Sequence, residues 1–148
     1  MKRLNQLLLI ALGIGSVAAS MPAGAAPSAK IRDVCIAAPT GGGGFNTFVL
    51  RNVEPLTAGG AITLQGLYYV TGSQRVSSLH GSAAMHSNGT VRLGFFVHST
   101  AESINDFTVS GVTDANFVGT VSYDNDGDFA PNGILTMQVA DCATLNIP

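Results

Sequence analysis

Three histidines, His80, His86 and His98, are the first candidates for metal chemistry, because three imidazole rings can hold a zinc ion. All three rings would have to lie within about 2.1 Å of that ion. The strand pattern described below places His80 and His98 near one end of a hairpin, and His86 six residues away near the other end. We therefore expect solvated surface histidines and no metal site.

A second candidate is the run Asp124-Asn125-Asp126-Gly127-Asp128, whose alternating acids are typical of calcium loops. A helix–loop–helix calcium site also needs a glycine at its sixth position and a bidentate glutamate at its twelfth. Counted from Asp124, those positions hold Phe129 and Leu135. Aspartate and glycine also favour tight turns, so we interpret this run as an acidic turn between strands.

Neither phosphate binding nor covalent catalysis has a recognisable motif. The four glycines at 41–44 lack the Gly-Lys-Ser/Thr ending of a phosphate loop, so a flexible connector is expected there. There is no Gly-x-Ser-x-Gly elbow. No two acidic residues share a predicted inward face, so the interior has no residue pair for general acid–base catalysis. The sequence thus favours a binding protein without a cofactor over an enzyme.

The N-terminal residues indicate export. Lys2 and Arg3 precede an apolar run at 7–19, and Ala23-Gly24-Ala25 has the small-residue pattern of a cleavage site. The run is too short to cross a bilayer of about 30 Å as a helix. We expect a signal peptide at 1–25, a single domain at 26–148 and a periplasmic or extracellular location. An integral membrane protein is not expected.

Composition bounds the class of protein. Hydrophobic residues make up 46% of the 148 residues, which favours a folded core over disorder. Two of the seven basic residues lie in the leader. The remainder therefore has five basic and nine acidic residues, and its net charge is −4. No basic patch remains, and a nucleic-acid partner is therefore excluded.

The two cysteines, Cys35 and Cys142, lie near the two ends of the expected domain. A lone pair in an exported chain is typical of a disulfide, because the compartment is oxidising. The pair has no C-x-x-C spacing and no neighbouring histidine, as a zinc or redox site would require. We predict a Cys35–Cys142 disulfide.

The rest of the chain predicts an all-β fold. Short runs rich in Val, Thr, Phe, Tyr and Ile alternate with turn residues, and no stretch beyond the leader keeps a helical period. The eight expected strands are Asp33–Ala37, Asn46–Val53, Ala61–Val70, Ser78–His86, Thr90–Ser99, Phe107–Val112, Asn116–Tyr123 and Ile134–Asp141. Every connection is short, so each strand should pair with the next in an antiparallel meander.

The hairpin around Asn88-Gly89 has two candidate registers. A two-residue turn would place the apolar face of one strand opposite the polar face of the other. A three-residue loop at 87–89 pairs His86 with Thr90 and makes the apolar faces coincide. It also gives Gly89 the left-handed position, which costs glycine nothing. We predict this second register, with the three histidines and Phe96 on the outer face.

The same alternation assigns the other side chains. Expected inward residues are Val34, Ile36, Phe48, Leu50, Ile62, Leu64, Tyr68, Val70, Phe107, Val109, Phe117, Val121, Tyr123, Leu135, Met137 and Val139. Expected outward polar residues are Asn46, Asn52, Thr63, Gln65, Arg92, Thr108 and Gln138, which suit water better than lipid. Both cysteines also point outward, and pairing the first strand with the eighth would bring them together.

We therefore predict an eight-stranded antiparallel meander barrel closed by the disulfide, which removes the exposed edges of an open sheet. The alternative is a two-sheet β-sandwich, although the short links and the lack of tryptophan disfavour it. The barrel architecture is similar to that of lipocalins and avidins. The tryptophans that mark those families are absent, so the resemblance implies the architecture alone.

Two roles follow from this fold. Inward glycines and alanines, including Gly66, Gly81 and Gly111, would either leave an interior pocket for a small apolar ligand or let the strands bend. The expected pocket wall is Tyr68, Phe95, Phe107, Phe117 and Met137. The alternative role is a surface or structural protein that contacts a protein partner through the outward aromatics Tyr69 and Phe96.

Overall fold

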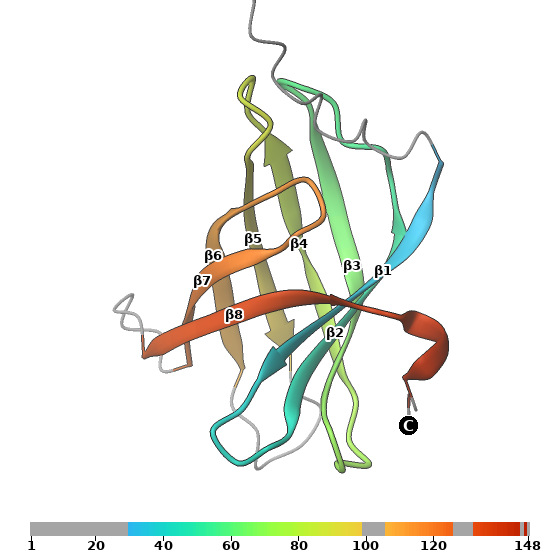
Figure 1. Cartoon of the computed structure of the whole chain (residues 1–148), viewed down its shortest axis with the longest axis vertical. Helices are drawn as coiled ribbons and strands as arrows, with labels where there is room; N and C mark the ends of the chain where they lie inside the picture. The colour runs from blue at the N-terminus through green and yellow to red at the C-terminus, as the bar shows by residue number, and fades with distance from the viewer. Residues whose placement is uncertain (1–29, 99–105, 126–131, 146, 148) are drawn as a thin grey trace, which may run out of the picture.

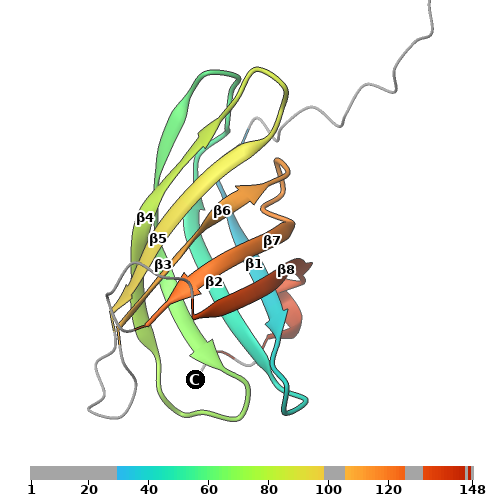
Figure 2. The ribbon, with the colours of Figure 1, turned by 90° about the vertical axis from the view of Figure 1, so that its left-hand side faces the viewer.

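Eight antiparallel strands form a closed barrel in which each strand pairs with the next and β8 pairs with β1 (Figures 1 and 2). The computed structural model describes residues 30–98, 106–125, 132–145 and 147. The strands are β1 Arg32–Pro39, β2 Phe45–Val53, β3 Ala61–Val70, β4 Ser77–Met85, β5 Val91–His98, β6 Phe107–Thr113, β7 Gly119–Asp124 and β8 Gly133–Ala140. The predicted meander barrel is confirmed, and the sandwich is excluded because the sheet closes on itself.

The predicted register of the β4–β5 hairpin is also confirmed. Met85 pairs with Val91 and Gly81 with Phe95, so the apolar faces coincide. The His86 amide donates to the Thr90 carbonyl at 2.8 Å, and Gly89 has a φ of 84°. The alternation of apolar and polar residues fixes this register, because a slip by one residue would turn every side chain to the other face.

The inward glycines bring strands together and do not create an empty interior. A Cβ added to Gly66 would overlap the carbonyl oxygen of Val49, and one added to Gly81 would overlap that of Gly94. Large side chains such as Phe48 and Leu50 fill the middle of the barrel and are fully buried. The alternative in which these glycines line a ligand cavity is therefore wrong, and they permit bending of the sheet.

The β2–β3 connection and the β6–β7 turn lie at the end of the barrel that is uppermost in Figure 1, which we call the upper end, and they bring Leu56 and Phe117 into the core. Phe117 is 1% exposed and Leu56 is 4% exposed. Phe117 has a φ of 63° and lies in the turn between β6 and β7, so the prediction that it belongs to a strand is wrong. The Asp114 carboxylate stabilises this turn by accepting the Asn116 amide at 2.8 Å.

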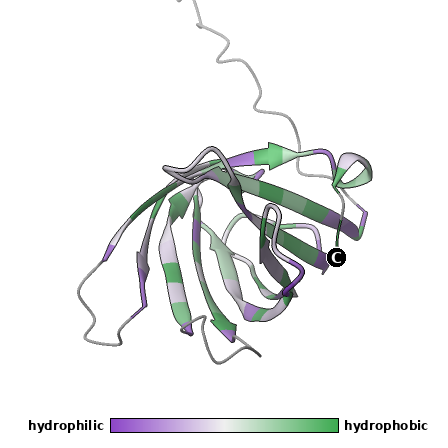
Figure 3. Cartoon of the chain, turned by 90° about the horizontal axis from the view of Figure 1, so that it is seen from below, coloured by the Kyte–Doolittle hydropathy of each residue, from purple (hydrophilic) through white to green (hydrophobic). Residues whose placement is uncertain are grey.

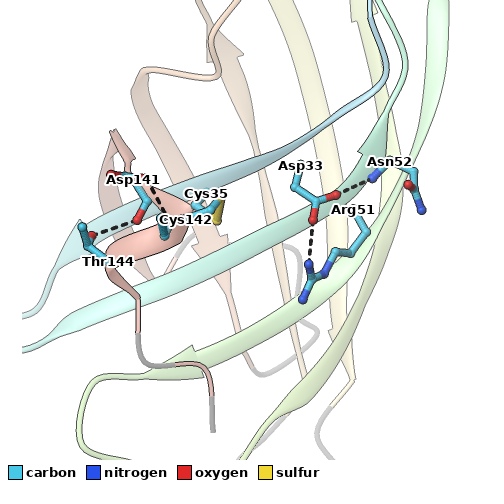
Figure 4. Close-up of a disulfide and its surroundings, with 8 residues drawn as sticks. Asp33, Cys35, Arg51, Asn52, Asp141, Cys142 and Thr144 are labelled. Atoms are coloured by element: carbon cyan, nitrogen blue, oxygen red, sulfur yellow. Dashed lines mark hydrogen bonds and ion pairs between the residues drawn. A yellow bond between two sulfur atoms is a disulfide. The ribbon is translucent and has the colours of Figure 1, made fainter.

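Residues 141–145 and 147, which we call the strap, follow β8 and lie on the outside of the barrel. A 3₁₀ helix at Cys142–Thr144 begins the strap, and the predicted Cys35–Cys142 disulfide fixes it to β1 (Figure 4). Strap residues pack against an outer apolar cluster that contains Tyr69. Tyr69 is only 5% exposed, so the prediction that it forms an exposed anchor is wrong.

Val139 is a second correction to the expected core. It has inward parity, since it pairs with the buried Ile36, yet it is 58% exposed. The reason is geometric: the pairing of β7 with β8 reaches only Met137, so no strand covers Val139 on that side. No helix in the described part of the chain is long and apolar enough to cross a membrane.

Candidate functional site

A pocket of about 540 Å³ lies at the lower end of the barrel, where the β1–β2 turn brings the chain back. Figure 3 views the molecule from this end. Strand ends from β1, β2, β3, β6, β7 and β8 all contribute to the pocket, which we call the rim pocket. Its lining is Pro39, Thr40, Gly41, Asn46, Tyr68, Phe107, Tyr123, Asn125, Ile134 and Leu135. Buried core side chains occupy the upper end of the barrel, whereas the lower end holds this pocket, so the two ends differ.

Tyr68 forms the polar centre of the rim pocket. Its hydroxyl donates to Asn46 Oδ1 at 2.8 Å. Burial raises the pKa of Tyr68 to about 12, so the phenol stays neutral across the physiological range. Asn46 was expected on the outer face, and that prediction is wrong. It shares the parity of the inward Phe48 on β2 and is half-buried beside Tyr68.

Aromatic rings hold Tyr68 in place. The Phe107 ring meets it edge-on, with ring centroids 5.0 Å apart, and the Phe48 ring is tilted against it with centroids 5.2 Å apart. Aromatic pairs in such arrangements add about 0.5–1.5 kcal/mol to the burial of their area. The hydroxyl direction is therefore fixed before any ligand binds.

The far wall of the pocket comes from β7 and β8. Tyr123 is half-buried and packs so closely on Gly133 that an added Cβ would lie 2.6 Å from its Cε1 atom. Ile134 is 70% exposed, which is unusual for a large apolar side chain in a pocket lining. Its exposure has a simple cause, because Ile134 alternates with the buried Leu135 and Met137 and therefore faces outward at the edge of the pocket.

The five residues predicted as a pocket wall separate into two groups. Tyr68 and Phe107 line the rim pocket. Phe95 packs on Phe48 inside the barrel, Met137 is fully buried and Phe117 belongs to the core at the upper end. A role of all five in ligand binding stays a prediction, and the structure brings only the first two to this pocket.

Sequence reasoning missed most of the pocket lining. Thr40, Asn125 and Ile134 lie at or just beyond strand ends. The alternation of apolar and polar residues, which identified the inward positions, gives little guidance there. Asn46 could have been predicted to face inward, because it alternates along β2 with Phe48 and Leu50 and so shares their face. The predicted inward positions of Tyr123 and Leu135 were the only other indication of this wall.

The histidines lie on the outer face as predicted. Phe96 is flanked by His80, with ring centroids 5.6 Å apart, and by His98 at 6.3 Å. His98 Nδ1 lies 3.0 Å from Asp106 Oδ2. Within the described ranges no three metal-ligating side chains come together. The acidic run includes Asp126, Gly127 and Asp128, which lie outside the described residues.

The rim pocket combines aromatic rings and aliphatic side chains with several neutral polar groups, which are the Tyr68–Asn46 pair, Thr40 and Asn125, so its lining suits non-covalent binding. Apolar area removed from water contributes roughly 25 cal/mol per Å², and a polar pair orients what binds. No family model, curated protein or solved structure matches this chain. The class established by the fold is an eight-stranded antiparallel meander barrel, and its function has to be argued from the pocket.

Proposed function

We propose that this protein is an exported binding protein that holds a small, largely apolar ligand in the rim pocket. The observation that carries the proposal is the pocket of about 540 Å³, walled by Tyr68, Phe107 and Tyr123 at the lower end of the barrel. Ligand pockets in proteins commonly have volumes of about 300–1,000 Å³ and apolar walls with a few polar groups. Eight-stranded barrels are wide enough to hold one small molecule.

Two features support export. The expected signal peptide at 1–25 would direct the chain out of the cytoplasm, and the Cys35–Cys142 disulfide is typical of an oxidising compartment. A protein that carries an apolar molecule through water gains from such a pocket, because part of the apolar surface of the ligand is removed from water.

The test uses N-phenyl-1-naphthylamine, a neutral probe whose fluorescence rises in apolar surroundings. We expect the probe to bind the mature protein, and Ile134→Lys to weaken that binding about threefold, because the substitution removes an apolar side chain from the edge of the pocket. Ile134 is already 70% exposed, so the substitution should leave folding intact. Val112→Lys is the matched control, since Val112 is 52% exposed and outside the lining.

Each outcome has a clear meaning. Weaker binding in Ile134→Lys together with normal binding in Val112→Lys supports the rim pocket. No fluorescence rise with the unaltered protein would contradict the proposal. Probe binding that only Val112→Lys weakens would place binding on the outer sheet, in the hollow that Val112 lines with Arg92 and Ser110. That result would favour the alternative role in contact with a protein partner.

A further inference from the structure

We infer, on the basis of the proposed binding function, that the rim pocket selects an uncharged, ring-bearing ligand that carries a carbonyl or amide group. The proposal names the chemical class of the ligand and excludes fatty acids, organic phosphates and other anions as its preferred occupants. It rests on three properties of the lining: its lack of charge, its polar pair and its fixed rings.

The first property is the absence of charge. No Lys, Arg, His, Asp or Glu occurs among the described residues that line the pocket, where the titratable side chains are Tyr68 and Tyr123. A carboxylate or phosphate that entered would lose hydration, and no cation among these described residues would replace it. A neutral ligand loses far less, so the lining discriminates against anions by desolvation.

The second property is the hydrogen-bonding capacity left on the Tyr68–Asn46 pair. The tyrosine proton is used on Asn46 Oδ1, so the Asn46 amide nitrogen keeps its donors and the Tyr68 oxygen keeps an acceptor site. If the Asn46 amide group is reversed, its nitrogen donates to the Tyr68 oxygen. The pair still keeps a free donor and a free acceptor, because Tyr68 then offers its proton and Asn46 its oxygen. The pair therefore offers at least one donor and one acceptor to a ligand, which a carbonyl or amide group can use.

The third property is the arrangement of the rings. Phe107 and Phe48 both pack against the Tyr68 ring, and Gly133 leaves just enough space for the Tyr123 ring. Three aromatic side chains, Tyr68, Phe107 and Tyr123, line the pocket and favour a ring-bearing ligand, because stacked and edge-to-face rings gain more than flexible chains do. Thr40 and Asn125 add neutral polar groups to the lining, which again suits a ligand without charge.

The experiment compares three probes with the same ring system: 2-naphthamide, 2-naphthoate and naphthalene. Each is titrated into ¹⁵N-labelled mature protein, and the amide resonances of Gly41 and Tyr123 report occupancy of the pocket by their shifts. We expect 2-naphthamide to bind at least about tenfold more tightly than 2-naphthoate, and several-fold more tightly than naphthalene.

Variants then assign the preference to the polar pair. Tyr68→Phe and Asn46→Leu should reduce the affinity for 2-naphthamide about three- to tenfold and should not reduce that for naphthalene, which has no group that can bond to the polar pair. Tyr69→Phe is the matched control, since this neighbouring tyrosine lies on the outer face beneath the strap. It should change neither affinity. Thermal unfolding of each variant shows whether the fold is retained.

The two proposals fail in different ways. If none of the three probes shifts the pocket resonances, the proposed binding function is overturned. If all three bind with similar affinity, the pocket binds ligands but the selection for neutral carbonyl compounds is overturned. Tighter binding of 2-naphthoate would overturn it as well, and so would a preference for 2-naphthamide that persists in both Tyr68→Phe and Asn46→Leu.

Discussion

Two adjacent tyrosines show how the surroundings of one hydroxyl decide its contribution to stability. The Tyr68 hydroxyl donates to Asn46 inside the barrel. The Tyr69 hydroxyl is buried beneath the strap and has no hydrogen-bond partner within the described part of the chain. A buried polar group without a partner costs about 1–3 kcal/mol, whereas a paired one contributes about 1 kcal/mol.

We therefore predict opposite effects for the two hydroxyl deletions. Tyr68→Phe should lower the free energy of unfolding by about 1 kcal/mol, and Tyr69→Phe should raise it by up to about 1 kcal/mol. Urea denaturation followed by circular dichroism measures both, and each variant serves as the control for the other. A loss of stability in Tyr69→Phe would mean that its hydroxyl has a partner.

The carboxylate of Asp33 should make stability depend on pH at the acid end. The Asn52 amide that donates to it, and then the Arg51 guanidinium 2.6 Å away, hold its pKa below the ordinary value of 3.8. Because the folded-state pKa is the lower one, this stabilisation is present above about pH 4 and is lost as the pH falls through the folded-state pKa.

Asp33→Asn tests that dependence. The variant should be less stable than the unaltered protein at pH 7, and the difference should shrink at pH 3, since the unaltered carboxylate is then being protonated. Both values come from urea midpoints at the two pH values. Glu54→Gln, an exposed acid outside this pair, is the control and should leave the pH dependence unchanged. A constant difference between pH 7 and pH 3 would contradict the assignment.

Single residues also mark where sequence reasoning fails. Phe117 was correctly expected in the core, because its hydrophobicity alone demands burial. It reaches the core from a turn with a positive φ, which is uncommon for a bulky residue and has no sequence signal. Tyr69 was expected to be exposed because strand alternation shows only which face a residue occupies. It does not show that the strap covers that face.

At the scale of the strands, close backbone approach at two glycines should be essential to the barrel. Gly66 and Gly81 lie against the carbonyl groups of neighbouring strands with no space for a methyl group. We predict that Gly66→Ala and Gly81→Ala each lower the free energy of unfolding by about 2–4 kcal/mol, because backbone must move. Chemical denaturation measures the loss.

Gly94 supplies the matched control for those two substitutions. It also lies in the middle of a strand, on β5, but the nearest atom to an added Cβ is 4.0 Å away. Gly94→Ala should therefore be neutral or slightly stabilising, since alanine restricts the unfolded chain more than glycine does. Equal losses in all three variants would show that strand flexibility, rather than close approach, decides the effect.

The strands themselves were the most predictable part of the fold. The β4–β5 register followed from alternation, because only one pairing puts Leu79, Ala83 and Met85 on the same side as their apolar partners. The rim pocket was not predictable in the same way. Residues such as Thr40, Asn125 and Ile134 meet only because the strands tilt and end at one rim, and no periodic pattern reports that convergence.

The whole molecule is asymmetric along the barrel axis. At the upper end the buried Leu56 and Phe117 belong to the core, whereas the lower end holds the rim pocket. The outer surface carries the strap and the histidines, none of which is among the described residues that line the pocket.

Closure of this barrel depends on a short seam. β1 and β8 pair only from Cys35 to Ala37, whereas β3 and β4 pair over most of their length. The disulfide lies beside this seam and joins residues 107 positions apart in the chain. Cross-linking so long a loop removes much of the entropy of the unfolded chain, and losing such a native disulfide typically costs about 2–5 kcal/mol.

We therefore predict that the double variant Cys35→Ala/Cys142→Ala opens first at the β1–β8 seam. The free energy of unfolding should fall by about 2–5 kcal/mol, and amide hydrogens that bond across the seam should exchange well before those between β3 and β4. Hydrogen exchange measured by NMR reports both strand pairs in one sample, with the disulfide-bonded protein as the control. If both pairs lose protection by the same free energy, the barrel unfolds as one unit, and the disulfide acts on the whole chain rather than on the seam.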